Sequence, residues 1–485
     1  KTGYPVEMLN LEMGLDADLG IDSIKRVEIM AALRSLLPGS PEIRPEYLGS
    51  LQTLQHICEF LAHPSGAKPA EVDTAALAPV PATELVPGLP SQQIEVMRQL
   101  VRPVDMQSGE QREALFLLRG AHVWLIDDGS DLGRRIEECL QAKRLKVRRG
   151  DQYEKFSGKG VASPAALVIL TPAKRSDGTF LKRAFRMMQL AGPALRKAGG
   201  AGTAILLTVS RLDGAFGFGA MDASADAISG GLAGLLKTAR REWPQVHCKA
   251  LDLDPEAMPA GEAASQIVDE MFRAGPVEVG LSGRARVKLE VYFAPMAPAA
   301  VNDAPMPLNE NDVVVISGGG RGVTGDAALA FARTFRSTLV LLGRSLLADG
   351  EPEGLREQHA EAEIKKALFA TLPRGSSPGA LEASYRQLLA QREIRAQLSA
   401  IEAVGARAVY CSVDVRDGAA VARVLAEVRQ RYGAIRGLVH GAGVLADRRI
   451  EDKTEDQFDS VYGTKVSGLQ NLLSALARED LRVIA

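Results

Sequence analysis

The residues most able to do chemistry lie in a glycine-rich stretch from Ser317 to Gly325, which reads Ser-Gly-Gly-Gly-Arg-Gly-Val-Thr-Gly. It follows a β-branched run at 313–316 and precedes a helix-forming run at 326–333. A strand, a glycine turn and a helix in this order can cradle a nucleotide pyrophosphate, because glycines permit close approach and the first helical N–H groups point at the charge. A tight turn can also need glycine for steric reasons alone. The predicted cradle residues are Gly318, Gly319, Gly320, Arg321, Gly322 and Val323.

The end of the next predicted strand, at 339–343, indicates which nucleotide would bind. Arg344 and Ser345 follow this strand directly. In folds that select NAD, an acidic residue at this position bonds the ribose 2′-hydroxyl, whereas a guanidinium and a hydroxyl suit a 2′-phosphate. The sequence therefore predicts NADPH, although a solvated arginine after a strand is also common in itself.

Ser23 is placed for a different chemistry. It stands at the N-cap of a predicted helix at 24–33, whose apolar residues form one stripe. Its hydroxyl could simply accept a backbone N–H, which stabilises a helix by about 1 kcal/mol. An exposed hydroxyl at a helix N-terminus could also carry a phosphodiester, whose negative charge is stabilised there.

The residues around Ser23 favour the second interpretation. Residues 19–28 read Leu-Gly-Ile-Asp-Ser-Ile-Lys-Arg-Val-Glu, which resembles the acyl carrier protein signature in the form of the tandem carriers of polyunsaturated fatty acid synthases. The resemblance implies that a phosphopantetheinyl transferase esterifies Ser23 with 4′-phosphopantetheine. It also implies a carrier domain at 1–62, which we expect to lack its front helix. A Pro- and Ala-rich stretch at 63–91 predicts a semi-stiff tether.

Residues 92–300 alternate predicted strands and helices, which indicates a doubly wound sheet. The turn after the first strand begins Asp127-Asp128-Gly129, and its carboxylates would repel a pyrophosphate, so we expect no nucleotide there. Residues 229–242 and 251–254 resemble the structural half of polyketide-type ketoreductases. The implied role of this half is to support the catalytic half.

Residues 308–485 resemble the catalytic, NADPH-binding half of the same reductases, with an insertion at 346–403 predicted to be a solvent-covered helical hairpin. Thr324 departs from the glycine usual in such cradles, and Tyr462 is out of register with Lys465 for the catalytic tyrosine. The resemblance implies that Lys465 is catalytic, bonding the nicotinamide ribose and lowering the pKa of the catalytic tyrosine. The remaining cofactor contacts that it implies are Asp414, Val415, His440, Ala442 and Gly443. A lone histidine such as His440 is more often simply buried and hydrogen-bonded.

The predicted fold class is α/β: a small helical carrier followed by two Rossmann-like doubly wound halves of a short-chain-reductase-type ketoreductase, the second incomplete. In the family, the serine that polarises the ketone and the tyrosine that protonates it come on the next strand and helix, and we expect them to lie outside this chain. The predicted function is reduction of a carrier-bound 3-ketoacyl thioester within a multidomain fatty acid or polyketide synthase. The alternative is a non-catalytic carrier and scaffold segment.

Composition limits the partners. With 58 basic and 60 acidic residues, the chain shows no charge excess that favours nucleic acid, and no apolar run is long enough to span a membrane. The four isolated cysteines lack metal-ligand spacing and predict reduced core thiols, no metal site and a cytoplasmic location. The expected partners are an acyl thioester, the transferase and other synthase domains: ketosynthase, acyltransferase, dehydratase and sister carriers.

Overall fold

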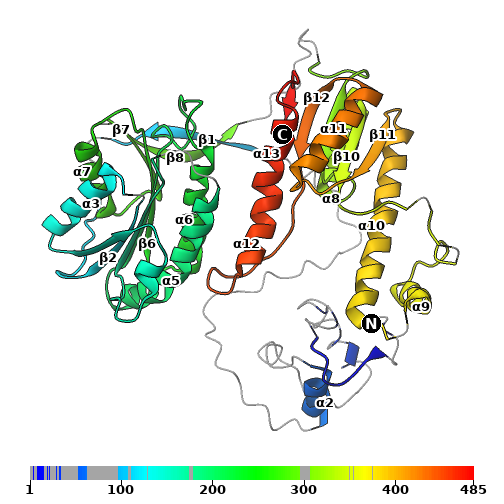
Figure 1. The fold of residues 1–485 in the computed structure, drawn as a ribbon, viewed down its shortest axis with the longest axis horizontal. Helices are drawn as coiled ribbons and strands as arrows, with labels where there is room; N and C mark the ends of the chain where they lie inside the picture. The colour runs from blue at the N-terminus through cyan, green and yellow to red at the C-terminus, as the bar shows by residue number, and fades with distance from the viewer. Residues whose placement is uncertain are drawn as a thin grey trace, which may run out of the picture. The chain divides into compact units, whose positions relative to one another are not determined.

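The computed structural model places most of the chain beyond residue 96 and parts of the first 62 residues (Figure 1). The described residues are 4, 8–15, 19, 21, 29, 32–33, 53–62, 97–107, 111–127, 129–173, 178–283, 285–294, 306–348, 350–352, 354–373 and 375–485. Ser23, most of the helix predicted at 24–33 and the whole tether predicted at 63–91 lie outside them.

The chain forms two units, each built on its own sheet. One unit comprises residues 1–90, 305–443 and 463–485, and the other comprises 91–304 and 444–462. We call the first the cradle unit, because it contains residues 317–325, and the second the support unit.

The support unit contains, among its described residues, an eight-stranded sheet in the order β1-β8-β7-β6-β5-β4-β2-β3. Its strands are β1 (Arg98–Asp105), β2 (His122–Ile126), β3 (Lys146–Gly150), β4 (Ala166–Leu170), β5 (Ile205–Ser210), β6 (His247–Leu253), β7 (Glu278–Ser282) and β8 (Ala285–Ala294). Its helices are α3 (Asp131–Ala142), α4 (Glu154–Ser157), α5 (Thr179–Ala201), η3 (Ala227–Gly230), α6 (Gly231–Glu242), α7 (Ala260–Met271) and α12 (Glu455–Tyr462).

The six strands from β3 to β7 run parallel, and β8 and β1 add an antiparallel edge that the alternating pattern did not predict. Helices α5 and α6 pack on one face of the sheet, and α3 and α7 pack on the other (Figure 1). Strands β4 and β5 are buried along their whole length, because helices cover both faces. The predicted doubly wound architecture is therefore confirmed for this unit.

The cradle unit contains a five-stranded parallel sheet in the order β11-β10-β9-β12-β13. Its strands are β9 (Val313–Ser317), β10 (Thr338–Gly343), β11 (Ala408–Ser412), β12 (Ile435–His440) and β13 (Val483–Ile484). Its helices are α2 (Leu54–Ala62), α8 (Gly322–Phe335), α9 (Glu361–Thr371), α10 (Pro378–Ala403), α11 (Gly418–Tyr432), the π-helical turn η4 (Gly463–Ser467) and α13 (Gly468–Ala475). Helices α8 and α10 pack on one face and α11 and α13 on the other. This is the strand order of a Rossmann fold.

Two expectations need correction. The insertion does form helices α9 and α10, but one apolar face is covered by residues near the N-terminus instead of solvent. The cysteines are free, yet Cys58 is exposed on α2, so the prediction of four core thiols is wrong for it. Within the part of the chain that is described, no helix combines the length and apolar character needed to cross a bilayer.

A buried charge cluster holds the edge of the support unit together. Glu270 on α7 is fully buried, and its carboxylate accepts hydrogen bonds from Arg112 at 2.5 and 2.8 Å and from the Lys249 ammonium at 2.8 Å. Burial alone would raise the pKa of Glu270, but these cations outweigh burial and hold the pKa below its usual value. The ionised carboxylate therefore stabilises the fold at neutral pH, and this contribution is lost as pH falls through the depressed pKa.

We predict that Glu270→Gln lowers the free energy of unfolding of the support unit by about 3–5 kcal/mol, because it leaves two buried cations without their anion. The matched control is Glu278→Gln, which removes a half-exposed pair with Lys237 and should cost at most about 1 kcal/mol. Both tryptophans, Trp124 and Trp243, belong to this unit, so tryptophan fluorescence during denaturant unfolding measures it. Equal losses in the two variants would contradict the assignment.

Candidate functional site

The predicted cradle lies where the direction of strand succession reverses in the cradle unit. Strand β9 is central and buried along its whole length, as its β-branched residues favour, and the chain leaves it at Ser317. Its neighbours are β10 on one side and β12 on the other. In open α/β sheets, ligands bind beside the carboxyl ends of the strands at this reversal point.

Glycine is required at Gly318 for two reasons. Its φ of +77° lies in the left-handed region, and a Cβ there would lie 2.9 Å from the Ala442 nitrogen and the Gly441 carbonyl carbon. The turn after β9 and the segment after β12 therefore touch backbone to backbone. The predicted residues of the two segments, far apart in sequence, form one surface.

The same contact explains the unusual Thr324. A Cβ added to Gly441 would lie 2.3 Å from the Thr324 Cγ2 and 2.4 Å from its Oγ1. The threonine side chain thus occupies the space that a side chain at position 441 would need. The departure from the usual glycine at 324 is accommodated by the glycine opposite, a pairing that sequence spacing alone did not reveal.

The first turn of α8 can receive an anion. Arg321 is its N-cap and, within the described part of the chain, gives the first helical N–H groups no side-chain hydrogen bond. Arg321 and Gly322 are exposed, and Val323 is 86% exposed. Open N–H groups at a helix N-terminus beside a glycine turn fit the pyrophosphate of a dinucleotide.

The loop after β10 is fixed by side chains of β11. The Tyr410 hydroxyl donates to the Ser345 carbonyl at 2.9 Å, and the Ser412 hydroxyl donates to the Arg344 carbonyl at 3.4 Å. The Arg344 side chain is exposed at this position. An exposed guanidinium next to a hydroxyl-bearing residue fits the 2′-phosphate of NADPH.

The two residues Asp414 and Val415, which lie just beyond β11, differ in character. The Asp414 carboxylate pairs with the Arg416 guanidinium at 2.6 Å, and these hydrogen bonds hold the pKa of Asp414 below its usual value. Val415 is buried in the core between the sheet, α11 and α13, and a Cβ on Gly468 would lie 2.8 Å from it. A cofactor contact by Val415, which stays a prediction, would therefore fall to its backbone.

His440 connects β12 to β9 and to the π-helical turn. Its Nε2 lies 3.0 Å from the Lys465 carbonyl and 3.2 Å from the Thr464 carbonyl, so Nε2 carries the proton and donates. Its Nδ1 then accepts from the Ser317 hydroxyl at 2.8 Å, while the Ser317 oxygen accepts from the Ala442 N–H at 3.2 Å. Burial, aided by the Lys465 charge, lowers the pKa of His440 and keeps the imidazole neutral.

Lys465 stands on the π-helical turn η4 with its side chain against the segment after β12. A Cβ on Gly443 would lie 3.1 Å from the Lys465 Cε and 3.2 Å from its Nζ. Turns of this type are frequent at functional sites. The structure therefore brings Gly443, His440 and Lys465 together at the edge of the cradle.

Tyr462 belongs to the support unit and packs there. Its ring stacks on Phe458 at 5.6 Å between centroids, and burial followed by the Asp226 charge raises the pKa of its hydroxyl. A tyrosine that acts as a proton donor in a reductase needs the opposite shift, toward the operating pH. The geometry thus agrees with a packing role.

Sequence reasoning missed Ser317 and Thr464 as supporting residues. Ser317 was identified only as the first residue of the glycine stretch, and Thr464 only as a neighbour of Lys465. Ser317 is fully buried, and its hydroxyl joins the two strands through His440 and Ala442. The available signal was a serine at the end of an otherwise apolar strand.

The equivalent turn of the support unit is filled by its own side chain. The Asp127 carboxylate accepts from the Gly129 N–H at 3.1 Å and from the Ser130 hydroxyl at 2.7 Å, and it pairs with Arg149 at 3.3 Å. A Cβ on Gly133, in the first turn of α3, would lie 2.1 Å from this carboxylate. The turn therefore holds an internal anion where a pyrophosphate would lie.

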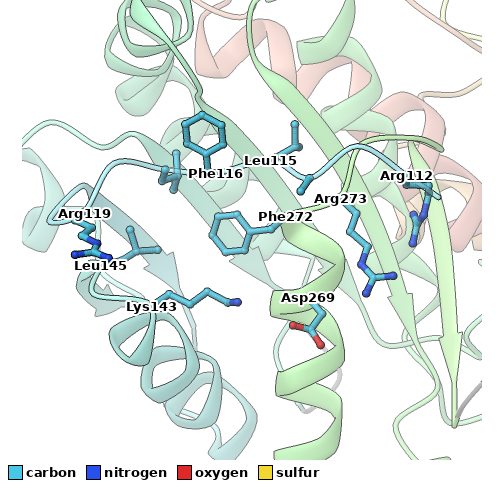
Figure 2. A pocket seen from close by; sticks show the side chains of 11 residues that line it. Arg112, Leu115, Phe116, Arg119, Lys143, Leu145, Asp269, Phe272 and Arg273 are labelled. Carbon is cyan, nitrogen blue, oxygen red and sulfur yellow. The ribbon is translucent and has the colours of Figure 1, made fainter.

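A surface hollow of about 630 Å³ lies elsewhere on the support unit (Figure 2). Phe116 and Phe272 form part of its lining together with Arg119, Lys143 and Arg273. Among the described residues that line it, none was predicted as a site residue.

Comparison with known proteins agrees with this geometry. Residues 313–485 match the family model of the KR domain. The chain is 29% identical to a polyunsaturated fatty acid synthase protein of Thraustochytrium sp., an alignment that covers 99% of this chain and 18% of the synthase. It is 24% identical to polyketide synthase PksN of Bacillus subtilis over 49% of this chain and 4% of that protein. The chain thus spans less than a fifth of these relatives.

Solved structures show the same fold. An A1-type ketoreductase is 21% identical with a TM-score of 0.55, and 80% of this chain and 73% of that chain are covered. A ketoreductase domain from the bacillaene assembly line is 22% identical with a TM-score of 0.51, with 78% and 71% covered. The chain therefore has the α/β Rossmann-like ketoreductase fold, and its residues 313–485 are a KR-domain region similar to those of polyketide and polyunsaturated fatty acid synthases.

Proposed function

We propose that residues 308–485 form the NADPH-binding, catalytic half of a 3-oxoacyl-[acyl carrier protein] reductase. We also propose that residues 1–62 carry the acyl chain on phosphopantetheine attached to Ser23. Both would act within a cytoplasmic multidomain synthase, beside ketosynthase, acyltransferase, dehydratase and sister carriers. The match to the KR domain and the likeness to the Thraustochytrium polyunsaturated fatty acid synthase support this assignment.

The observation that carries the reductase assignment is the backbone contact between Gly318 and Gly441–Ala442. It joins the open helix N-terminus to the segment that ends beside Lys465. Bound NADPH would supply hydride to the ketone carbon. The chain would contribute anion binding by the first turn of α8, 2′-phosphate recognition by Arg344 and Ser345, and a positive charge from Lys465 that orients the ribose and favours ionisation of the proton donor.

The reduction also needs a serine that polarises the ketone and a tyrosine that donates the proton. These partners, as the resemblance defines them, are not among the 485 residues, and the stacking of Tyr462 makes it a poor substitute. We therefore propose that this chain by itself binds the cofactor but does not reduce a ketoacyl thioester.

We predict that Arg344→Ala weakens NADPH binding about 10- to 100-fold, the effect of losing charge-assisted hydrogen bonds to the 2′-phosphate. NADH binding should not change, because NADH has a hydroxyl in that place. Arg333→Ala, which removes an exposed arginine in the last turn of α8, is the control and should bind both nucleotides normally. Calorimetric titration measures the affinities, and an equal loss for NADPH and NADH in the Arg344 variant would refute the assignment.

For the carrier, we predict that incubation with coenzyme A and a phosphopantetheinyl transferase adds one phosphopantetheinyl group to the chain. Ser23→Ala should abolish the addition, whereas Ser35→Ala, further along the same segment, should not. Intact-mass spectrometry detects the change. If the unaltered chain gains no mass while a known carrier in the same tube is modified, the carrier assignment fails.

A further inference from the structure

The two helices of the insertion enclose a lysine that is unusually deep for its type. Lys365 on α9 is only 1% exposed, and its ammonium pairs with Glu361 at 2.7 Å and with Glu382 of α10 at 2.8 Å. Lysine is almost never fully buried unless it is paired. Something besides the two helices must shield this ion cluster from water.

Residues near the N-terminus provide that cover. The Tyr4 ring lies over the Lys365 ammonium at 4.2 Å from its centroid, while Tyr385 of α10 lies at 5.1 Å. The Tyr4 hydroxyl is 2.8 Å from the Leu19 carbonyl and 3.1 Å from Glu382 Oε2, so these two acceptors share its proton. One tyrosine therefore joins the backbone just before Ser23 to the ion cluster of the insertion.

The surrounding contact is apolar and continuous. Buried side chains from both segments form a single cluster. Its members from the N-terminal segment are Tyr4, Met8, Leu15, Leu19, Ile21, Ile57 and Phe60, and those from the insertion are Leu355, Ile364, Leu368, Leu381 and Leu388. The polar anchor thus sits within a hydrophobic interface, where charge-assisted contacts are protected from solvent.

Helix α10 also supports the cradle through its other half. The Gln397 side chain donates to the Gly325 carbonyl at 2.6 Å, and a Cβ on Gly320 would lie 3.1 Å from Ile394. The rise of an α-helix places Glu382 and Gln397 about 22 Å apart along the same rigid element. The anchor and the cradle are therefore held at a fixed separation by one helix.

We propose that the α9–α10 hairpin is a docking site for the N-terminal segment, with Tyr4, Lys365 and Glu382 as its polar anchor. The interaction rests on the proposed function in one respect only: if residues 1–62 are a carrier, the hairpin is the element by which the reductase holds that carrier near its cradle. The docking itself requires no modification of Ser23.

The test is hydrogen–deuterium exchange of the full chain, resolved by peptide mass spectrometry. Tyr4→Ala should speed exchange about tenfold in hairpin peptides spanning 361–388, although the substitution lies far away in sequence. Glu382→Gln should have the reciprocal effect on peptides spanning 8–21. Peptides of β9 and β12 should exchange as before, which shows that the sheet remains folded.

Arg386→Gln is the matched control, because Arg386 pairs with Glu382 from an exposed position on the same helix and is not part of the anchor. It should leave peptides 8–21 unchanged. Unaltered hairpin exchange in Tyr4→Ala, or unaltered 8–21 exchange in Glu382→Gln, would overturn the docking proposal. The result is independent of Ser23, so an unmodified Ser23 would defeat the carrier assignment while leaving the docking result in place.

Discussion

The contact between the turn after β9 and the segment after β12 is the constraint on which the candidate site depends. Two backbones can approach this closely only because Gly318 and Gly441 have no side chains, and because Gly318 can adopt a positive φ. The Ser317 hydroxyl, which accepts from the Ala442 N–H and donates to His440, fixes the two strand ends. His440 passes this order on to the turn that carries Lys465.

Electrostatics supports the same arrangement. The imidazole stays neutral because burial and the nearby Lys465 ammonium disfavour a second positive charge, and a neutral ring can both accept from Ser317 and donate to the backbone. Positive charge at the cradle therefore comes from Arg321, Arg344 and Lys465, which are exposed. In the support unit the corresponding turn has taken the opposite course, since Asp127 supplies its own anion to the loop.

Much of the fold could be predicted from the sequence, because β-branched runs and glycine turns report local structure directly. Helix α3 was predicted with its observed bounds, whereas β1 and β8 were missed because antiparallel edge strands break the alternation of strand and helix. Within the site, the cradle glycines could be identified from spacing, but the fit of Thr324 against Gly441 could not. Spacing along the chain does not show which side chain fills the space above a distant glycine.

The insertion illustrates the same limit on a larger scale. Its charges and apolar residues predicted a helical hairpin, which the structure contains, but helical periodicity does not show what covers an apolar face. Only the position of Tyr4 over Lys365 identifies the N-terminal segment as that cover. Helix α10 thereby links the two parts of the chain for which chemistry is proposed.

The fluorescence of NADPH tests the central claim most directly, namely that this chain contains a cofactor cradle without the residues that complete reduction. Mixing the chain with NADPH should change the intensity of nicotinamide emission as the cofactor leaves water. The new level should then remain constant after a 3-oxoacyl thioester is added. No change on mixing would contradict the cradle, and a steady loss of emission after the thioester is added would contradict the proposed lack of reduction.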